Sequence, residues 1–216
     1  MQTIIAPSIL AANFANLQKD IEMVNSSSAD WFHLDVMDGL FVPNISFGMP
    51  IVKSINNLTS KPLDVHLMIV DPERYINKFV DLNASIITVH YEACKNLKET
   101  LKKIRFNNIK SGVAINPETP INVIEEFIEE ADLICIMSVN PGFGGQKFIE
   151  NTYNKIEKLN EIIMRNETST LIEVDGGVSN INAEKLINLG ANVLVSGNYI
   201  FKAEDPLKNI NLLKSF

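Results

Sequence analysis

Short apolar segments alternate with longer amphipathic segments along the whole chain. The short segments are rich in β-branched and apolar residues, as buried strands are, and they recur about every 25 residues. The predicted strands cover residues 4–9, 31–35, 63–67, 86–90, 111–115, 133–137, 171–174 and 193–196. No long linker or low-complexity segment interrupts this order, so the pattern predicts one continuous series of strand units.

The segments between these strands have the spacing of helices that bury one face. They cover residues 16–24, 49–56, 72–82, 97–106, 121–130, 150–165, 182–189 and 205–213. Asp71, Pro72 and Glu73 predict a helix start, with a side-chain cap followed by proline and an acid in the first turn. Gly190 follows an apolar run and predicts a left-handed helix end.

Strict alternation of strand and helix predicts an α/β fold with a parallel sheet covered by helices. An open doubly wound sheet and a closed barrel both satisfy this pattern. Eight units at so short a period favour the barrel, and the sequence predicts a single (β/α)8 TIM barrel domain over residues 1–216. Side chains at the carboxyl ends of the strands are then the first candidates for a functional site.

Four potential metal ligands occur at three of these strand ends. His33 and Asp35 share one face of the second strand, His66 ends the third, and Asp175 follows the seventh. Two imidazoles and two carboxylates suit a divalent ion, with Zn²⁺ or Fe²⁺ favoured and Mn²⁺ or Co²⁺ also compatible. Charged groups inside a barrel are costly unless they are paired or bound to metal, so this set predicts a site.

Each of these four residues, taken alone, could have an ordinary structural role. His90 and Asp64 lie near them, and the role of His90 is left open by the sequence. His90, the last of the chain's three histidines, ends the fourth strand and fits either a place beside the site or a core or rim position. Asp64 lies one step deeper than His66 on the same face. We expect Asp64 to accept a hydrogen bond from below the ligands.

Glycine-rich loops follow the last three predicted strands. Glycine lets backbone N–H groups approach an anion closely, and loops after the seventh and eighth strands of such barrels often hold phosphate. Any single glycine pair is an ordinary turn signal, but three loops together predict a phosphate site. The residues concerned are Gly142, Gly144, Gly145, Gly176, Gly177, Gly197 and Asn198.

Composition and charge narrow the choice of partners. The formal net charge is -7 and no basic stripe is present, which argues against nucleic acid and anionic membrane surfaces. No apolar run approaches the roughly 18 residues of a membrane span, and the first residues do not resemble a secretory signal. Cys94 and Cys135 form no disulfide framework. These features predict a cytoplasmic protein.

Several motifs, in order along nearly the whole chain, resemble those of the ribulose-phosphate 3-epimerase family. They lie at residues 6–10, 33–39, 41–44, 64–68, 116–120, 137–146 and 173–178. The resemblance implies a ribulose-phosphate-binding barrel and an isomerase of carbohydrate metabolism. Its expected reaction is the metal-dependent interconversion of D-ribulose 5-phosphate and D-xylulose 5-phosphate, through an enediolate, as in pentose phosphate metabolism.

The resemblance also implies a role for each site residue. His33, Asp35, His66 and Asp175 correspond to metal ligands, and Asp35 and Asp175 also to the two acid/base groups. Ser8 and His66 correspond to substrate contacts. The glycine loops and Asn198 correspond to the family's phosphate-binding region. Three methionines correspond to residues that line the family's site, and they are Met37, Met68 and Met137. The family further implies a homo-oligomer, either a dimer or a hexamer.

Some departures keep alternatives open. The family usually has Gly-Ser-Ala where this chain has Gly197, Asn198 and Tyr199, so a related 3-epimerase of D-allulose 6-phosphate remains an alternative. A Schiff-base or metal aldolase on the same barrel is another, although no interior strand end clearly supplies the lysine that a Schiff base needs. Related decarboxylases need a lysine where this chain has Met37. The partner expected is a phosphorylated ketose substrate.

Overall fold

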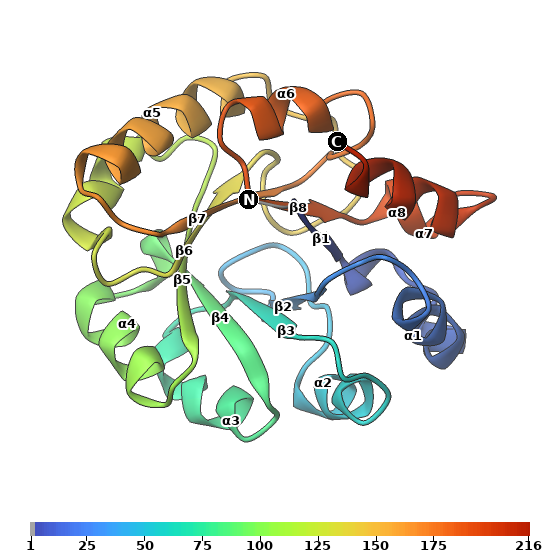
Figure 1. Cartoon of the computed structure of the whole chain (residues 1–216). Helices are drawn as coiled ribbons and strands as arrows, with labels where there is room; N and C mark the ends of the chain where they lie inside the picture. Colours follow the sequence, from blue (N-terminus) through green and yellow to red (C-terminus); the bar gives the residue numbers. More distant parts are fainter. Residues whose placement is uncertain (1–2) are drawn as a thin grey trace.

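The computed structural model describes residues 3–216, and its strands form a ring that is surrounded by helices (Figure 1). The expected domain of residues 1–216 includes Met1 and Gln2, which lie outside the described residues. All paired strands run parallel, in the order β1-β8-β7-β6-β5-β4-β3-β2. The prediction of a (β/α)8 barrel is confirmed.

The ring closes where β1 meets β2. No ladder joins these two strands in the described part of the chain, but Ser8 forms an isolated bridge with His33. The N–H groups of Asp30 and Trp31 also donate to the carbonyl oxygen of Ile5, at 2.9 and 3.3 Å. The seam of the barrel is therefore held by a few hydrogen bonds, and two of the predicted site residues lie on it.

All eight predicted strands are present. They are β1 (Ile4–Pro7), β2 (Phe32–Met37), β3 (Leu63–Met68), β4 (Ala84–His90), β5 (Lys110–Ile115), β6 (Leu133–Met137), β7 (Leu171–Asp175) and β8 (Val193–Ser196). The bounds of β6 and β8 match the prediction. β1 ends earlier than predicted because the chain turns into a short 3₁₀ helix, η1 (Ile9–Ala11).

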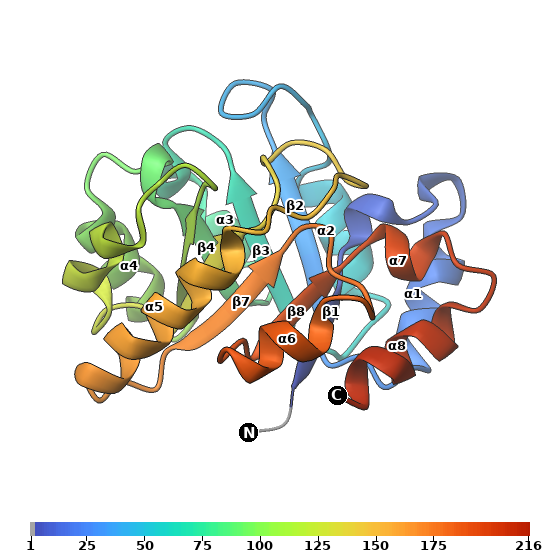
Figure 2. The ribbon, with the colours of Figure 1, turned by 90° about the horizontal axis from the view of Figure 1, so that it is seen from above.

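The helices lie outside the ring, while the longer loops gather at the end of the barrel toward which the strands point (Figure 2). The α-helices are α1 (Leu17–Asn25), α2 (Met49–Asn56), α3 (Ile76–Val80), α4 (Leu97–Phe106), α5 (Thr152–Arg165), α6 (Ala183–Asn188), α7 (Asn198–Phe201) and α8 (Pro206–Lys214). Four further 3₁₀ segments are η2 (Phe14–Asn16), η3 (Pro72–Arg74), η4 (Tyr91–Ala93) and η5 (Ile121–Phe127). Within residues 3–216 no helix has the length and apolar character needed to cross a membrane.

Two helix predictions were wrong in detail. The segment 72–82 is divided into η3 and α3, and Asp71 does not cap it, because its backbone is left-handed (φ 46°) and its carboxylate pairs with Lys95 at 2.7 Å instead. The segment 121–130 is not an α-helix but contains the 3₁₀ helix η5, whose buried residues Ile121 and Ile124 are three apart. This spacing matches the period of a 3₁₀ helix, which places such residues on one face. The predicted helix end at Gly190 is confirmed by its φ of 117°.

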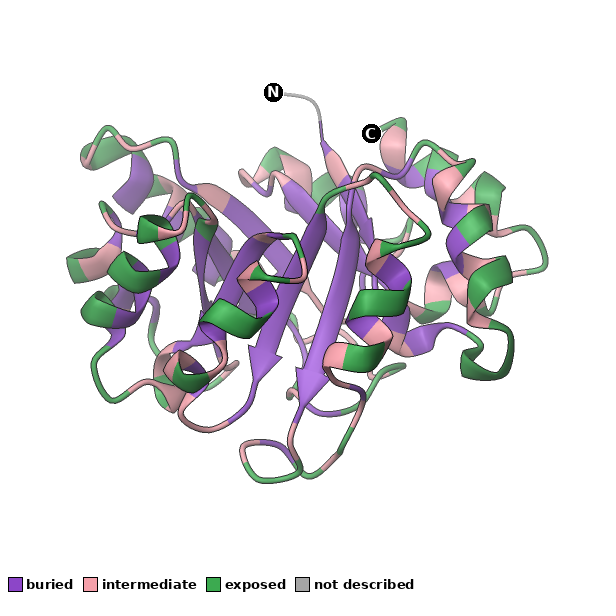
Figure 3. Ribbon diagram, turned by 90° about the horizontal axis from the view of Figure 1, so that it is seen from below, coloured by how far each residue is buried: buried purple, intermediate pink, exposed green. Residues whose placement is uncertain are grey.

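Buried residues form two layers, one inside the ring and one between the strands and the helices. In Figure 3 the strands are coloured as buried over most of their length, whereas the helices carry exposed residues on their outer sides. Along β6, Leu133, Cys135 and Met137 belong to the inner layer, whereas Ile134 and Ile136 pack outward. The same alternation turns Phe32, Leu34 and Val36 of β2 outward, and likewise Leu63, Val65 and Leu67 of β3 and Ile172 and Val174 of β7. It therefore leaves the polar positions of these three strands facing the barrel axis.

Candidate active site

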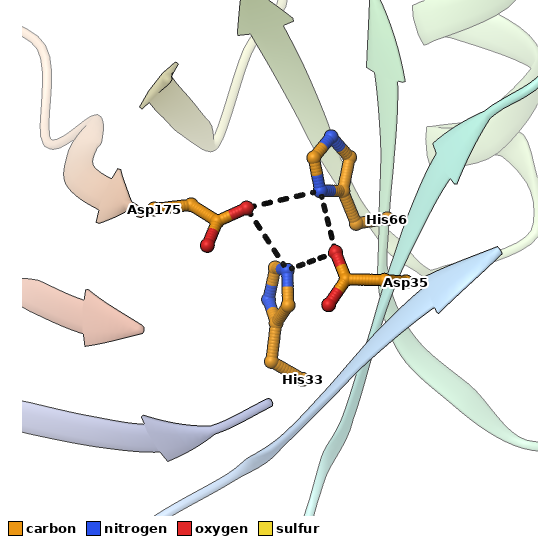
Figure 4. A group of neighbouring side chains, drawn as sticks. All are labelled: His33, Asp35, His66 and Asp175. Carbon is orange, nitrogen blue, oxygen red and sulfur yellow. Dashed lines mark ion pairs between the residues drawn. The ribbon is translucent and has the colours of Figure 1, made fainter. Parts of the chain in front are cut away.

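His33, Asp35, His66 and Asp175 meet inside the carboxyl end of the barrel (Figure 4). β2 carries the first two, β3 carries His66 and β7 ends at Asp175. One ligand atom from each of the four lies within 4.8 Å of the others. The sequence predicted this convergence, whereas the roles of the four residues as ligands stay a prediction.

Two ring nitrogens face the centre of this group. His33 Nε2 lies 3.2 Å from Asp35 Oδ1 and 3.7 Å from Asp175 Oδ2. His66 Nδ1 lies 3.3 Å from Asp35 Oδ1 and 3.6 Å from Asp175 Oδ2. Both nitrogens are buried and have no hydrogen-bond partner among the described residues. Two free imidazole nitrogens beside two carboxylates form a donor set that fits a divalent metal ion.

Acidic side chains support His33 from below. Asp64 Oδ2 lies 2.6 Å from His33 Nδ1, where we expected an acceptor, so Nδ1 can donate and the lone pair of Nε2 faces the centre. Glu173 lies deeper, with Oε1 3.9 Å from His33 Nδ1. Burial, followed by the charge of Asp64, raises the pKa of Glu173 well above its ordinary value, which favours its neutral form.

Electrostatics hold Asp35 ionised and favour protonated histidines when no metal is bound. Burial alone would raise the pKa of Asp35, but the neighbouring charge of His33 outweighs it and lowers this pKa. Burial alone would lower the pKa of His33, yet Asp35 and Asp64 raise it well above its ordinary value. Ser8 Oγ donates to Asp35 Oδ2 at 2.6 Å and further stabilises the carboxylate.

His90 lies directly behind His66. Their Nε2 atoms are 2.9 Å apart, and the two ring planes differ by only 17°, so the rings meet edge to edge. Burial lowers the pKa of His90 to about 4, so this ring is neutral near pH 7. Of the two positions that the sequence left open, the structure places His90 beside the site.

A cavity of about 250 Å³ opens above Asp35 and Asp175. The predicted substrate-binding residues that line it are Ser8, Met37, Met68, Met137, Gly142, Gly144, Gly145, Gly176, Gly177, Gly197 and Asn198. His66 is not part of the cavity wall, because it is fully buried beneath and only Nδ1 points toward the other site residues. Binding roles for these residues remain predictions.

The wall of this cavity contains no lysine or arginine among the described residues. An anion held there would have to rely on backbone N–H groups and on dipoles. Gly177 shows why glycine is needed, since its φ is 64° and a Cβ would lie 2.9 Å from the backbone nitrogen of Phe148. The closely packed loops after β6 and β7 therefore require a residue without a side chain.

Several lining residues were not predicted from the sequence. They are Leu10, Ala11, Val139, Pro141, Phe143, Gln146, Val178, Ser179, Val195 and Tyr199. Gln146 Nε2 donates to the carbonyl oxygens of Asn140 and Phe143, at 2.6 and 2.8 Å, and so braces the loop after β6. Its position directly after the glycines of that loop was the available signal.

Comparison with known proteins identifies the family. A sequence model described as the ribulose-phosphate 3 epimerase family matches residues 4–201. The ribulose-phosphate 3-epimerase of Bacillus subtilis is 46% identical over 211 residues, which are 97% of this chain and 97% of that protein. The chain belongs to the ribulose-phosphate 3-epimerase family. The chloroplastic ribulose-5-phosphate-3-epimerase of Arabidopsis thaliana is 45% identical, over 98% of this chain and 76% of that protein.

Solved structures with low sequence identity share the fold of this epimerase family member. The crystal structure of KGPDC from Streptococcus mutans has a TM-score of 0.74 at 14% identity, covering 100% of this chain and 97% of that chain. Orotidine 5'-phosphate decarboxylase from Pyrococcus horikoshii has a TM-score of 0.69 at 14% identity, covering 98% of both chains. These likenesses support the barrel, and the family assignment depends on the closer relatives.

Proposed function

We propose that this chain interconverts D-ribulose 5-phosphate and D-xylulose 5-phosphate by inverting carbon 3 of the sugar. One observation carries the proposal. The carboxylates of Asp35 and Asp175 face the same cavity whose floor holds two unpartnered imidazole nitrogens and whose wall is built from glycine loops. Proton transfer, charge stabilisation and phosphate binding thus have groups in one place.

Inversion at carbon 3 requires a proton to leave one face and a proton to arrive on the other. Asp35, held ionised by its surroundings, can take the proton from carbon 3, and the electron pair of that C–H bond moves to the C2 carbonyl to give an enediolate. A proton delivered through Asp175 then reaches carbon 3 from the opposite face, where the enediolate electron pair forms the new C–H bond and the C2 carbonyl is restored. In the reverse direction the two carboxyl groups exchange roles.

A divalent ion bound by His33, Asp35, His66 and Asp175 supplies a Lewis acid that stabilises negative charge on the substrate oxygens. Zn²⁺ or Fe²⁺ is the ion that we propose, and Mn²⁺ and Co²⁺ also suit nitrogen and carboxylate donors. The side chains of Met37, Met68 and Met137 line the cavity beside these groups. Because thioethers are weak hydrogen-bond acceptors, they exclude water without competing for the sugar hydroxyls.

The substrate is a phosphorylated ketose whose phosphate we assign to the glycine loops. Asn198 begins α7 and lies against Gly144, so it joins the loops after β6 and β8. The same site could accept D-allulose 6-phosphate, and Asn198 with Tyr199 is where this chain departs from the family pattern. A Schiff-base aldolase is disfavoured, because none of the described residues that line the cavity is a lysine. We further propose a cytoplasmic homo-oligomer, a dimer or hexamer, as the family resemblance implies.

Turnover of D-ribulose 5-phosphate and of D-allulose 6-phosphate by metal-reconstituted protein tests the substrate. We expect higher kcat/KM with the pentulose, and the reverse order would reassign the chain to hexulose phosphates. Asp35→Asn and Asp175→Asn test the acid/base roles, with bound metal measured in each variant. Each should lose about 10²- to 10⁴-fold in kcat. Two variants that bind metal and keep more than about a tenth of the activity would contradict the mechanism.

A further inference from the structure

The second ring nitrogen of His66 contacts another histidine rather than an acid. His66 Nε2 lies 2.9 Å from His90 Nε2. Two nitrogens at this distance need one hydrogen between them, so one ring donates and the other accepts. His33 differs, because its second nitrogen meets the carboxylate of Asp64 directly. The direction of the His66–His90 hydrogen bond must therefore be decided elsewhere.

Glu92 decides this direction from the far side of His90. Its Oε2 lies 3.2 Å from His90 Nδ1. An ionised carboxylate can only accept, and the pKa of Glu92 is lowered to about 2, its burial being outweighed by hydrogen bonds from His90, Thr119 and Asn116. His90 must then carry its hydrogen on Nδ1 and accept with Nε2. His66 in turn must donate from Nε2, so that Nδ1 is the nitrogen that presents a lone pair once the ring is neutral.

Backbone contacts hold Glu92 in this orientation. Its Oε1 accepts from the N–H of Asn116 at 2.8 Å and from the hydroxyl of Thr119. Lys155, which is buried, donates to the carbonyl oxygens of Asn116 and Thr119 at 2.9 and 2.7 Å and fixes the same loop. Because a backbone N–H cannot become an acceptor, the oxygen that faces Asn116 has to stay an acceptor.

We propose that Glu92 is a positioning residue that acts through His90 to select the tautomer of His66 whose Nδ1 lone pair faces Asp35 and Asp175. The inference rests on the proposed function, because it assumes that His66 binds the metal through Nδ1. Glu92 touches neither the proposed ligand atoms nor the cavity wall. Its contribution is to keep one ligand ready for metal without a change of tautomer.

Glu92→Gln reverses this arrangement with little change of shape. The N–H of Asn116 requires the amide oxygen of the new side chain to face it, so the amide NH₂ group faces His90 Nδ1. His90 would then accept with Nδ1 and donate from Nε2, and His66 would carry its hydrogen on Nδ1, where it blocks metal. We expect Zn²⁺ affinity, measured by chelator competition, to fall about 10- to 100-fold.

Glu118→Gln is the matched control, because it removes one negative charge at an exposed residue of the loop that Glu92 contacts after β5. We expect its Zn²⁺ affinity to equal that of the unaltered protein, and thermal unfolding checks that both variants fold. Equal Zn²⁺ affinity in Glu92→Gln and the unaltered protein would overturn the role of Glu92 alone. Failure of the unaltered protein to bind any divalent ion would instead overturn the proposed function.

Imidazole ¹⁵N NMR gives a readout that needs no variant. The chain has only three histidines, so the rings can be assigned one by one. In the unaltered Zn²⁺-loaded protein we expect the hydrogen of His90 on Nδ1 and that of His66 on Nε2. In folded Glu92→Gln without metal, at a pH high enough for His66 to be neutral, the hydrogen of His90 should move to Nε2. A His90 hydrogen on Nε2 in the unaltered protein would overturn the inference.

Discussion

At the scale of single residues, protons and metal compete for the same imidazole nitrogens. Burial would lower the pKa of His66, but the nearby carboxylates of Asp175 and Asp35 raise it, and the pKa of His33 is raised by Asp35 and Asp64. Metal-free protein therefore favours protonated rings at a pH where free histidine is already neutral. A metal ion has to displace these protons, so its affinity depends on pH.

This competition predicts how stability depends on pH. A raised histidine pKa contributes stability that is fully present below the ordinary pKa of about 6.5 and is lost as the pH rises through the raised pKa. Metal-free protein loses this contribution, whereas metal binding strengthens as protons leave. We expect the difference in Tm between Zn²⁺-loaded and metal-free protein to widen from about pH 6 to about pH 8. A difference that narrows over this range would contradict the proton competition.

Ser8→Ala tests the support of Asp35. The change removes the buried hydroxyl that donates to Asp35 Oδ2 at 2.6 Å. Hydrogen bonds to charged groups contribute about 1.5–3 kcal/mol, so we expect kcat to fall about 10- to 100-fold and the acidic limb of the pH profile to move to higher pH. Ser54→Ala, which changes an exposed hydroxyl on α2, is the control and should keep full activity. An unchanged pH profile would mean that Ser8 does not stabilise the ionised carboxylate.

At the scale of elements, alternating apolar positions made the barrel predictable. β3 shows why, since Leu63, Val65 and Leu67 pack outward and the residues between them face the axis. The four metal-ligand candidates could therefore be placed on one side from strand parity alone. The role of Asp71 could not be predicted in this way. Its carboxylate pairs with Lys95, 24 residues away in sequence, and no local pattern shows that contact.

Glu92 marks a similar limit at the site itself. The sequence shows His90 and Glu92 two residues apart at a strand end, but it does not show that the same carboxylate reaches Asn116 and Thr119 on the next unit. The glycine loops were predictable in part. Their position after β6, β7 and β8 was predictable, whereas the lining side chains such as Gln146 and Tyr199 required the arrangement of neighbouring loops.

Gly177→Ala tests the loop after β7 as an element. Alanine would adopt a φ of 64° and place its Cβ 2.9 Å from the nitrogen of Phe148. We expect a loss of stability of about 1–3 kcal/mol and a rise in KM larger than any change in kcat. Gly48→Ala is the control, because no atom lies within 4 Å of its Cβ and its φ is negative. A variant with unchanged KM would mean that this loop does not bind the substrate.

At the scale of the whole molecule, a bound ion would join strands from distant parts of the chain. The four proposed ligands come from β2, β3 and β7, and their histidines and Asp35 are buried. A ligand that binds only the folded state at about 1,000 times its Kd adds roughly 4 kcal/mol. The chain is also acidic, with a net charge of -7, so a bound cation would reduce charge repulsion toward an anionic substrate.

Removal of metal should therefore destabilise the whole barrel. For a protein of this size we expect chelation to lower Tm by about 8–16 °C, measured by thermal unfolding with and without excess Zn²⁺. Asp175→Asn should show a much smaller difference between the two conditions, because one anionic ligand is missing. An equal response of this variant and the unaltered protein would place the ion elsewhere.

Because few hydrogen bonds join β1 to β2, the barrel and its site are complete only when β8 pairs with β1. β1, formed near the start of synthesis, takes its full ladder of partners only from β8, near the end. Ser8 and His33 face each other across that seam, and Asp175 arrives only with β7. A chain that has been made only as far as β7 therefore contains the four proposed ligands but lacks the part of the cavity wall that β8 and the residues after it supply. We therefore expect activity only after β8 has paired with β1 and closed the barrel.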